Sequence, residues 1–355
     1  TTRESVRVLG LEDTGEWRAA LEQIPGGCEP FFLPEFYRVA ADHAHAQAEC
    51  FVFEEDGSLA VYPYLRRRLS ALPFIPGNSL LCDLTGGYGY NGAVSTSGDV
   101  EFARRFREAF CNHCETSHVV TEFVRFHPLL GNAKLFAGDC TITLENQNVA
   151  LDLRRPLEEI RSSYEHSCRK NLKKARREGV STFVEEGVGA SFEEFLRLYD
   201  GTMVRVGAGR AYRFERSYLE GLARRLSPAP VFVYAQWRGR IVSCEMALRS
   251  GQIIYSYLGG TEADAFPVRP NNALKDALIG WAHEAGCKWY LIGGGLKPGD
   301  DIFRYKRTLA PDGVIPFHIG RRIYDPPAYE DVISRWQAAR APRAADRTRL
   351  QCYWE

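Results

Sequence analysis

Residues 251–310 read GQIIYSYLGGTEADAFPVRPNNALKDALIGWAHEAGCKWYLIGGGLKPGDDIFRYKRTLA. Near its start, the side chains of residues 253–258 alternate between two faces, which is the two-residue period of a β-strand. Apolar residues stand on both faces, so both are expected to be packed. Farther on, apolar residues recur at helical spacing between 274 and 285. Asn271 and Asn272 stand just before them, and either can cap a helix. The stretch therefore predicts a strand followed by a capped helix.

The same stretch continues with a second strand and a turn. The apolar run 289–292 ends in the glycine triple 293–295. After the turn, Asp300 opens a short basic-aromatic segment that contains Lys306. A glycine triple at the end of a strand lets a ligand approach the backbone closely. We therefore expect the functional site here.

Length and charge narrow the possible classes of protein. A chain of 355 residues exceeds the usual size of a single core, so two domains are expected. Because 45 basic residues balance 45 acidic ones, any contact with RNA must rest on a local patch, and we expect no binding to DNA. The sequence shows neither a membrane-length apolar run nor the apolar core of a secretion signal, so we expect a cytoplasmic protein.

The ten cysteines are scattered along the chain, which predicts reduced thiols. Cys111 and Cys114, with His118 close by, form the one spacing that resembles a metal site. The sequence has no second pair of cysteines at this spacing, and the apolar residues around Cys111 recur with helical periodicity. We therefore expect thiols packed within a helix and no metal.

The order of predicted elements is repeated. Each half shows two helices, a hairpin, a further helix and a strand, in that order. In the first half these elements are expected at 14–24, 34–44, 49–66, 99–115 and 119–126. In the second half they are expected at 192–205, 215–226, 231–248, 274–285 and 289–292. Asp56-Gly57 and Gly239 mark the two hairpin turns. The expected fold is α/β (α+β), with two tandem domains that each have a mixed, twisted sheet and helices on both faces.

We place the domains at 1–152 and 153–325, and we expect the tail 326–355 to dock back onto the first. The order of elements in each half is that of a GNAT N-acyltransferase domain.

A concentrated positive patch opens the second domain. Within about two helical turns lie Arg169, Lys170, Lys173, Lys174, Arg176 and Arg177, which only Glu178 offsets. Such a segment is either a solvated helix face or a surface for phosphate groups. Because six like charges repel one another, we favour contact with a phosphate backbone.

Several motifs together resemble the Fem family. In order, they are DLTGGYGYNG, RFHPLLGN, RKNLKKARREGV, MVR, YSYLGGTEAD and FRYKRTLAP. Members of that family are tandem-GNAT enzymes that move an aminoacyl group from aminoacyl-tRNA to an amine, and some relatives modify peptide and peptidyl-nucleoside antibiotics. The resemblance implies the same fold and a monomer that uses aminoacyl-tRNA as co-substrate, with no other cofactor.

The resemblance also implies residue roles. Lys306 matches the lysine that stabilises the transition state, Tyr257 and Tyr255 match tyrosines that line the acceptor channel, and Asp83 lies near a carboxylate proposed as a base. Cell-wall members hold the pyrophosphate of their precursor with an early lysine, whereas the first lysine here is Lys134. This departure points to an antibiotic intermediate rather than a peptidoglycan precursor as the acceptor.

Other polar residues complete the expected site. Tyr88 and Tyr90 lie among glycines and form either a ligand-contacting loop or a packed aromatic corner. Glu245 stands inside an apolar strand, where a carboxylate needs a partner, so it orients the amine or bonds a neighbouring arginine. The full substrate-binding set that we expect is Tyr88, Tyr90, Arg213, Glu245, Tyr255, Tyr257, Asn271, Gly294 and Tyr305.

The sequence thus predicts an aminoacyl-tRNA-dependent transferase that forms an amide on the amine of a small peptide-type acceptor. The ester of charged tRNA is already activated, so positioning and oxyanion stabilisation by Lys306 can supply most of the barrier reduction. Two alternatives stay open: an acyl-CoA-dependent N-acyltransferase of the same fold, and a non-catalytic RNA-binding module. CoA enzymes cradle pyrophosphate with a [QR]-x-x-G-x-[GA] run, whereas the segment after Tyr257 is acidic.

Overall fold

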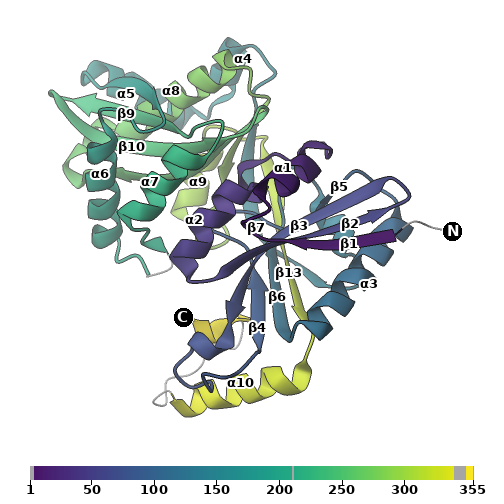
Figure 1. Ribbon diagram of the computed structural model, residues 1–355. Coiled ribbons are helices and arrows are strands. Elements are labelled where there is room, and N and C mark those ends of the chain that lie inside the picture. Colours follow the sequence, from purple (N-terminus) through teal and green to yellow (C-terminus); the bar gives the residue numbers. More distant parts are fainter. Residues whose placement is uncertain (1–3, 210–211, 340–348, 355) are drawn as a thin grey trace. The chain divides into compact units, whose positions relative to one another are not determined.

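The computed structural model describes residues 4–209, 212–339 and 349–354. The chain forms two compact units (Figure 1). Unit 1 comprises the residues up to Glu145 and those from Phe317 onward, and unit 2 comprises Asn146–Pro316. These limits fall inside the two strands β7 (Thr141–Asp152) and β13 (Val314–Ile323), a few residues before the boundaries placed from the sequence.

Unit 1 contains one mixed sheet. Its helices are α1 (Thr14–Glu22), α2 (Pro34–Ala44), α3 (Val100–Thr116) and α10 (Pro326–Ala339), with the 3-10 helices η1 (Pro30–Phe32), η2 (Leu69–Ala71), η3 (Asn132–Phe136) and η6 (Cys352–Trp354). Its strands, besides β13, are β1 (Glu4–Leu9), β2 (Gln47–Glu55), β3 (Ser58–Arg68), β4 (Cys82–Thr85), β5 (Val94–Ser95) and β6 (Val119–Arg125). The sheet runs β1-β2-β3-β4-β6-β13, and every pairing is antiparallel except β4 with β6.

Unit 2 repeats this architecture. Its helices are α4 (Leu157–Ser163), α5 (His166–Arg177), α6 (Phe192–Arg205), α7 (Arg216–Arg225), α8 (Pro270–Glu284) and α9 (Asp301–Arg307), with the 3-10 helix η5 (Ala263–Val268). Its strands, besides β7, are β8 (Ser181–Glu186), β9 (Val231–Trp237), β10 (Arg240–Arg249), β11 (Ile253–Thr261) and β12 (Trp289–Gly293). The sheet runs β8-β9-β10-β11-β12-β7, and only β11 with β12 is parallel. The predicted duplication is confirmed.

The two hairpins show why the repeat could be read from the sequence. Asp56 and Gly57 join β2 to β3 with φ angles of 48° and 82°. Arg238 and Gly239 join β9 to β10 with φ angles of 52° and 74°. Two consecutive residues with positive φ form the tight turn whose twist matches that of the flanking strands, and glycine takes up this conformation without strain.

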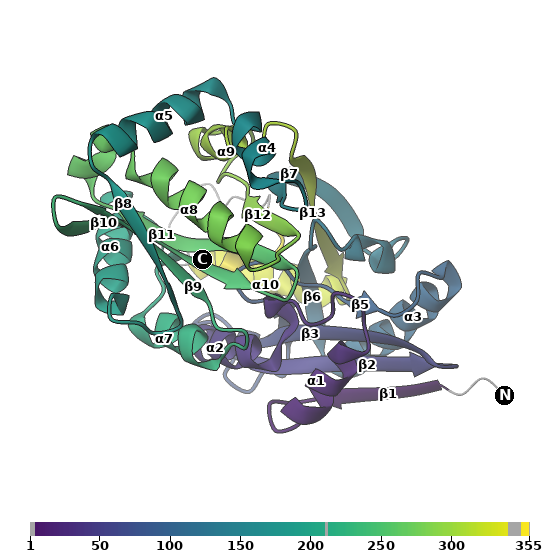
Figure 2. The ribbon, with the colours of Figure 1, turned by 90° about the horizontal axis from the view of Figure 1, so that it is seen from above.

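Helices cover both faces of each sheet because the strands carry apolar side chains on both sides. In unit 1, Phe51 and Phe53 of β2 pack against phenylalanine rings of α3, whereas Tyr37 of α2 donates a hydrogen bond to the carbonyl of Pro63 on β3. In unit 2, Phe232 packs against α6, whereas its neighbours on β9 belong to the core beneath α8. Figure 2 shows α5, α8 and α9 on one face of this sheet and α6 and α7 on the other.

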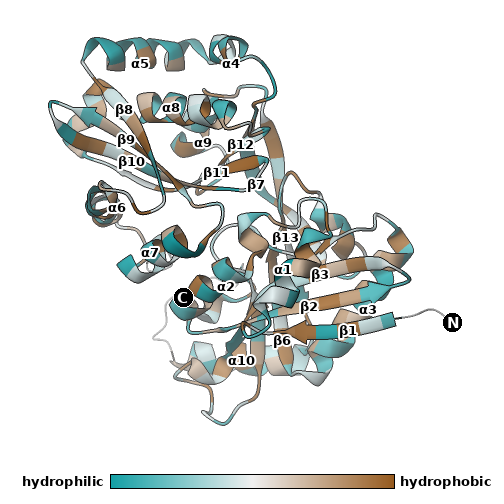
Figure 3. Ribbon diagram, turned by 45° about the horizontal axis from the view of Figure 1, so that its top comes forward, coloured by the Kyte–Doolittle hydropathy of each residue, from teal (hydrophilic) through white to brown (hydrophobic). Residues whose placement is uncertain are grey.

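The described part of the tail returns to unit 1, as expected. Val332 and Trp336 of α10, together with Tyr353, share a hydrophobic cluster with Leu69 and Val120. Figure 3 shows that hydrophobic residues gather in the strands, whereas α5 is largely hydrophilic. Within the described ranges, no helix combines the length and the apolarity that a membrane crossing requires.

The predicted caps of α8 are wrong. The helix begins at Pro270, and Arg269 occupies the N-cap position with a φ of 62° and no side-chain cap. Proline is favoured in the first turn because its φ is already helical and it lacks the N–H that would go unpaired there. By contrast, Asp300 stands at the start of α9, as predicted. Its carboxylate caps the helix by accepting a hydrogen bond of 2.8 Å from the backbone N–H of Phe303.

Candidate functional site

Lys306 lies on α9 and points back to the glycine turn after β12. Its Nζ donates a hydrogen bond of 2.8 Å to the carbonyl oxygen of Gly294. A Cβ atom added at Gly293 would lie 3.4 Å from the same Nζ, so the turn passes very close to the amino group. The structure thus brings Lys306 and Gly294 together, two of the residues predicted from the sequence.

Burial changes the acidity of Lys306. The side chain is partly buried, and desolvation lowers the pKa of Lys306 from its ordinary 10.5 to about 7. The positive charge of Lys275 lowers this pKa further, whereas Glu245 and Asp300 raise it. Lys306 can therefore hold or release a proton at neutral pH, as acid–base and oxyanion-stabilising groups do.

Position 294 has room only for a glycine, because backbone and side-chain atoms of unit 2 lie very close to it. A Cβ atom there would lie 2.6 Å from the carbonyl oxygen of Gln147 and 2.7 Å from Oδ1 of Asn148. Any side chain would push the turn away from β7, because real Cβ atoms do not come this close to other atoms. The backbone carbonyl that binds Lys306 is therefore fixed by close packing.

A buried polar network lies beneath the turn, and its central residue, Lys275, was missed from the sequence. Lys275 of α8 is 7% exposed and Glu245 of β10 is 5% exposed. The Nζ of Lys275 donates to Glu245 at 2.8 Å, to Oγ of Ser256 at 2.8 Å and to the hydroxyl of Tyr290 at 2.9 Å. Tyr290 donates in turn to Glu245 at 2.9 Å. Of the two roles expected for Glu245, pairing with a cation is observed, but the cation is Lys275 and not an arginine.

Tyr305 lies next to Lys306 on α9. Its hydroxyl is buried and has no hydrogen-bond partner among the described residues. Burial, then the negative charge of Glu245 and the thiol of Cys168 raise the pKa of Tyr305. Tyr305 is therefore electrostatically coupled to the network around Lys275.

The predicted tyrosine pair lies on the other face of the sheet. Ser256 points to Lys275 on α8, so its neighbours on β11, Tyr255 and Tyr257, point to the side of α6 and α7. The hydroxyl of Tyr257 lies 2.5 Å from that of Tyr218 on α7. The structure therefore does not group these tyrosines with Lys275 and Glu245.

Two further predicted residues lie elsewhere in unit 2. Arg213 is exposed in the loop before α7. Asn271, in the first turn of α8, accepts hydrogen bonds from Ser243 at 2.7 Å and Thr261 at 2.6 Å, which tie the helix to β10 and β11. Asn271 thus fastens the helix to the sheet.

The six predicted cations lie on α5, which packs against α8 through Cys168 and Ala175. All are exposed except Lys174, which is partly buried. Arg169 donates to the carbonyls of Ser162 and Tyr164, and Arg177 pairs with Glu178 at 3.2 Å. Of the other four, none forms an ion pair with any residue that the structure describes.

Helix α5 is joined directly to α9. The backbone N–H of Glu165, the N-cap residue of α5, donates to the carbonyl of Thr308 at 2.8 Å. The carboxylate of Glu165 also lies 3.6 Å from the guanidinium of Arg307. The basic helix therefore begins beside the segment that carries Lys306, and both belong to unit 2.

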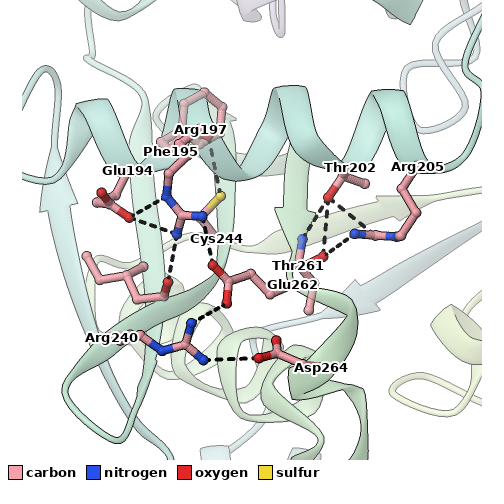
Figure 4. Close-up of polar contacts among 11 residues, drawn as sticks. Glu194, Phe195, Arg197, Thr202, Arg205, Arg240, Cys244, Thr261, Glu262 and Asp264 are labelled. Carbon is pink, nitrogen blue, oxygen red and sulfur yellow. Dashed lines mark hydrogen bonds and ion pairs between the residues drawn. The ribbon is translucent and has the colours of Figure 1, made fainter.

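The connection between β11 and α8 is held by ion pairs (Figure 4). Glu262 pairs with Arg197 at 2.7 Å and with Arg240 at 3.2 Å, and Arg240 also reaches Asp264 at 3.1 Å. Beside it, Arg205 donates to the carbonyl of Thr261 at 2.8 Å. Arg197 and Arg205 of α6 fasten the connection to that helix, and together with Glu262 they line a pocket of about 320 Å³.

In unit 1, Asp83 is buried and its oxygens are occupied. They accept hydrogen bonds from Thr121 at 2.6 Å and from Tyr353 and Trp354, both at 2.8 Å. Burial raises the pKa of Asp83, while nearby Arg67 lowers it. This arrangement suits a structural role for the carboxylate, as the anchor of the C-terminal segment, in place of the predicted role as a base.

Replacing Asp83 by asparagine tests this reassignment. Tyr353, which is buried, and Trp354, which is partly buried, lose their acceptor. Unfolding should therefore become easier by about 2–4 kcal/mol, while turnover per folded molecule stays unchanged. Urea unfolding followed by an activity assay measures both quantities. A large fall in turnover at full stability would restore the predicted role as a base.

The predicted tyrosine loop of unit 1 is an aromatic corner, at least at Tyr90. The Tyr90 ring packs edge-on against Phe31 and His127, with centroid distances of 5.3 Å to each. Tyr88 and Tyr90 are both partly buried. The thiol of Cys111 donates to Asp139 at 3.4 Å, and Cys114 is buried in the core beneath α3.

Comparisons with known proteins agree with this architecture. Residues 162–307 match the family model described as an acetyltransferase (GNAT) domain, so this segment is a GNAT domain. No sequence among curated proteins matches.

Three solved structures share the fold. FemX is 13% identical, with a TM-score of 0.66, over 92% of this chain and 99% of that one. The C-terminal domain of a putative lysylphosphatidylglycerol synthetase from Agrobacterium fabrum is 13% identical, with a TM-score of 0.56, over 92% and 95%. A tandem GNAT protein from the clavulanic acid biosynthesis pathway is 10% identical, with a TM-score of 0.52, over 91% and 99%. At these identities the likeness concerns the fold, which is that of a tandem GNAT protein, as predicted.

Proposed function

We propose that this chain is an aminoacyltransferase that moves an aminoacyl group from tRNA to the amine of a small peptide-type acceptor. The observation that carries the proposal is the junction of α5 and α9. A helix with four cations that form no ion pair among the described residues begins beside the segment that holds Lys306. Cations of this kind bind the phosphates of nucleic acids. A tRNA held on α5 would then bring its charged end toward Lys306.

The chemistry requires few groups. The neutral amine attacks the ester carbonyl, a C–N bond forms, and the resulting oxyanion needs a positive donor before the ester C–O bond breaks. Lys306 supplies that donor when it is protonated. Its hydrogen bond to Gly294 holds the amino group in a defined position before substrate binds.

For the acceptor, we propose an intermediate of a peptide or peptidyl-nucleoside antibiotic rather than a peptidoglycan precursor. The support is the absence of any lysine before Lys134, since cell-wall members of the Fem family use an early lysine to hold a pyrophosphate. The similarity in fold to FemX supports the class of reaction. The proposal includes a cytoplasmic monomer with no cofactor besides charged tRNA.

Acyl-CoA transfer is the second candidate, and the match to an acetyltransferase domain favours it. In this fold, pyrophosphate needs free backbone N–H groups between the strand and the following helix. Here the N–H of Glu262 donates to Val242 at 2.9 Å, and that of Ala265 donates to Glu262 at 3.2 Å. Pro267 and Pro270 have no N–H to offer, and Asp264 adds negative charge. The connection thus suits pyrophosphate poorly.

We therefore expect acetyl-CoA and longer acyl-CoAs to leave the melting temperature unchanged. A ligand present at a hundred times its Kd would stabilise the protein by about 2.7 kcal/mol, which a thermal-shift assay detects. An unrelated GNAT acetyltransferase known to bind CoA serves as the positive control. A clear shift with acetyl-CoA, accompanied by acetylation of an amine, would establish the second candidate instead.

A further inference from the structure

The pair formed by Lys275 and Glu245 has no role in the function proposed so far. All three N–H donors of Lys275 are used, by Glu245, Ser256 and Tyr290. Its ammonium also lies 2.6 Å from the second oxygen of Glu245. Removing two charges from water is costly, and apolar residues of similar size often stabilise a fold as well or better. Fold stability alone therefore does not explain the pair.

The location of the Lys275–Glu245 pair suggests a role near the glycine turn. The network joins α8, β10, β11 and β12 at one point. Tyr290, on β12, leads within a few residues to Gly293 and Gly294, the turn that receives the amino group of Lys306. The network and the turn that binds Lys306 therefore share one strand.

The charges around Lys306 come from three elements. Lys275 of α8 repels a proton on Lys306, whereas Glu245 of β10 and Asp300 at the start of α9 attract one. Among these charged groups, Lys275 has the largest effect on the pKa of Lys306, and it acts in the same direction as burial. Tyr305, beside Lys306, keeps its proton at neutral pH because burial and Glu245 raise its pKa.

We propose that Lys275 and Glu245 form a positioning pair that readies Lys306 to give a proton to the leaving ribose oxygen. The role rests on the proposed function. In that reaction the C–N bond forms, the ester C–O bond breaks, Lys306 protonates the departing oxygen, and the attacking amine returns a proton to Lys306. A proton donor works best when its pKa lies near the working pH.

The test is a direct titration of Lys306 by NMR, with lysine labelled by ¹³C at Cε. The chain has only eight lysines, and Lys306→Arg assigns the signal. In Lys275→Met the midpoint of Lys306 should rise by about one pH unit, because a like charge is removed while Glu245 stays. In Glu245→Gln the midpoint of Lys306 should fall, because a negative charge is removed. Tyr290→Phe is the matched control, since it removes a hydroxyl and no charge, and it should leave the midpoint in place.

Transfer assays with the same variants complete the test. The pH at which kcat declines should follow the Lys306 midpoint in each protein. If Lys275→Met does not fold, Lys275→Met combined with Glu245→Gln removes both charges and should still raise the midpoint, because Lys275 has the larger effect. Equal midpoints in all variants would overturn the pair's role. Shifted midpoints without aminoacyl transfer, even in the wild type, would overturn the proposed function and leave the electrostatic effect standing.

Discussion

Replacing Lys306 by alanine should lower kcat about a hundredfold or more, the scale of losing one donor to an oxyanion. The KM for the acceptor should change little, because the amino group contributes mainly in the transition state. Steady-state transfer assays at saturating tRNA measure both constants. Turnover within a few-fold of the wild type would remove Lys306 from the mechanism.

Lys306→Arg is the matched control, because it keeps the charge. In the wild type, kcat should fall as pH rises through about 7, since only the protonated amino group stabilises the oxyanion and its pKa is lowered to about 7. Arginine stays protonated throughout, so this decline should disappear in the variant, which should recover part of the turnover. An unchanged decline would assign it to another group.

Loss of activity in a Lys306 variant should not reflect loss of folding. Burial lowers the pKa of Lys306 below its ordinary 10.5, so the folded state binds fewer protons than the unfolded chain between pH 7 and 10.5. The stability of the wild type should therefore rise with pH across this window. Lys306→Met removes the cost of burying the charge and should raise the melting temperature at pH 7. A lower melting temperature would contradict this account of its burial.

The second large effect is expected on α5. Replacing Lys170 and Lys173 by glutamate should raise the KM for charged tRNA about tenfold or more at low salt, because both side chains are exposed and unpaired among the described residues. The difference from the wild type should shrink as salt increases, since salt screens contacts with phosphate. Transfer assays across a salt series measure this dependence.

A charge-matched control separates a local effect from a general one. The double variant Lys134→Glu with Lys288→Glu changes the net charge by the same amount as the α5 variant. Lys134 lies in unit 1, and Lys288 precedes β12, at the opposite end of that strand from the glycine turn. This variant should keep the wild-type KM for tRNA. If both double variants behave alike, α5 is an ordinary solvated helix face.

Much of the fold could be predicted because its signals are local. Asp56-Gly57 and Gly239 mark hairpin turns through conformations that glycine favours, and the helical periodicities lie within single segments. One local signal, the capping preference of asparagine, predicts the wrong N-cap residue for α8. Asparagine is a good cap, but Pro270 begins the helix, and the side chain of Asn271 bonds Ser243 and Thr261 instead.

The site was harder to predict because its contacts join distant segments. Lys275 and Glu245 are 30 residues apart, and each stands as a single charge in an apolar element. The need for a partner predicts a paired Glu245 but does not identify Lys275, because the sequence does not show which elements are neighbours. Asp83 resembled a base in the sequence because its partners lie in the tail, 270 residues away for Tyr353.

One measurement tests the central claim most directly: transfer of a labelled amino acid from purified charged tRNA to a panel of small peptide acceptors, followed by mass spectrometry. We predict an amide product formed in equal amount to the ester lost. No product should form with deacylated tRNA, after RNase treatment of the donor, or with acetyl-CoA in its place. Product that depends on acetyl-CoA and is indifferent to RNase would contradict the claim.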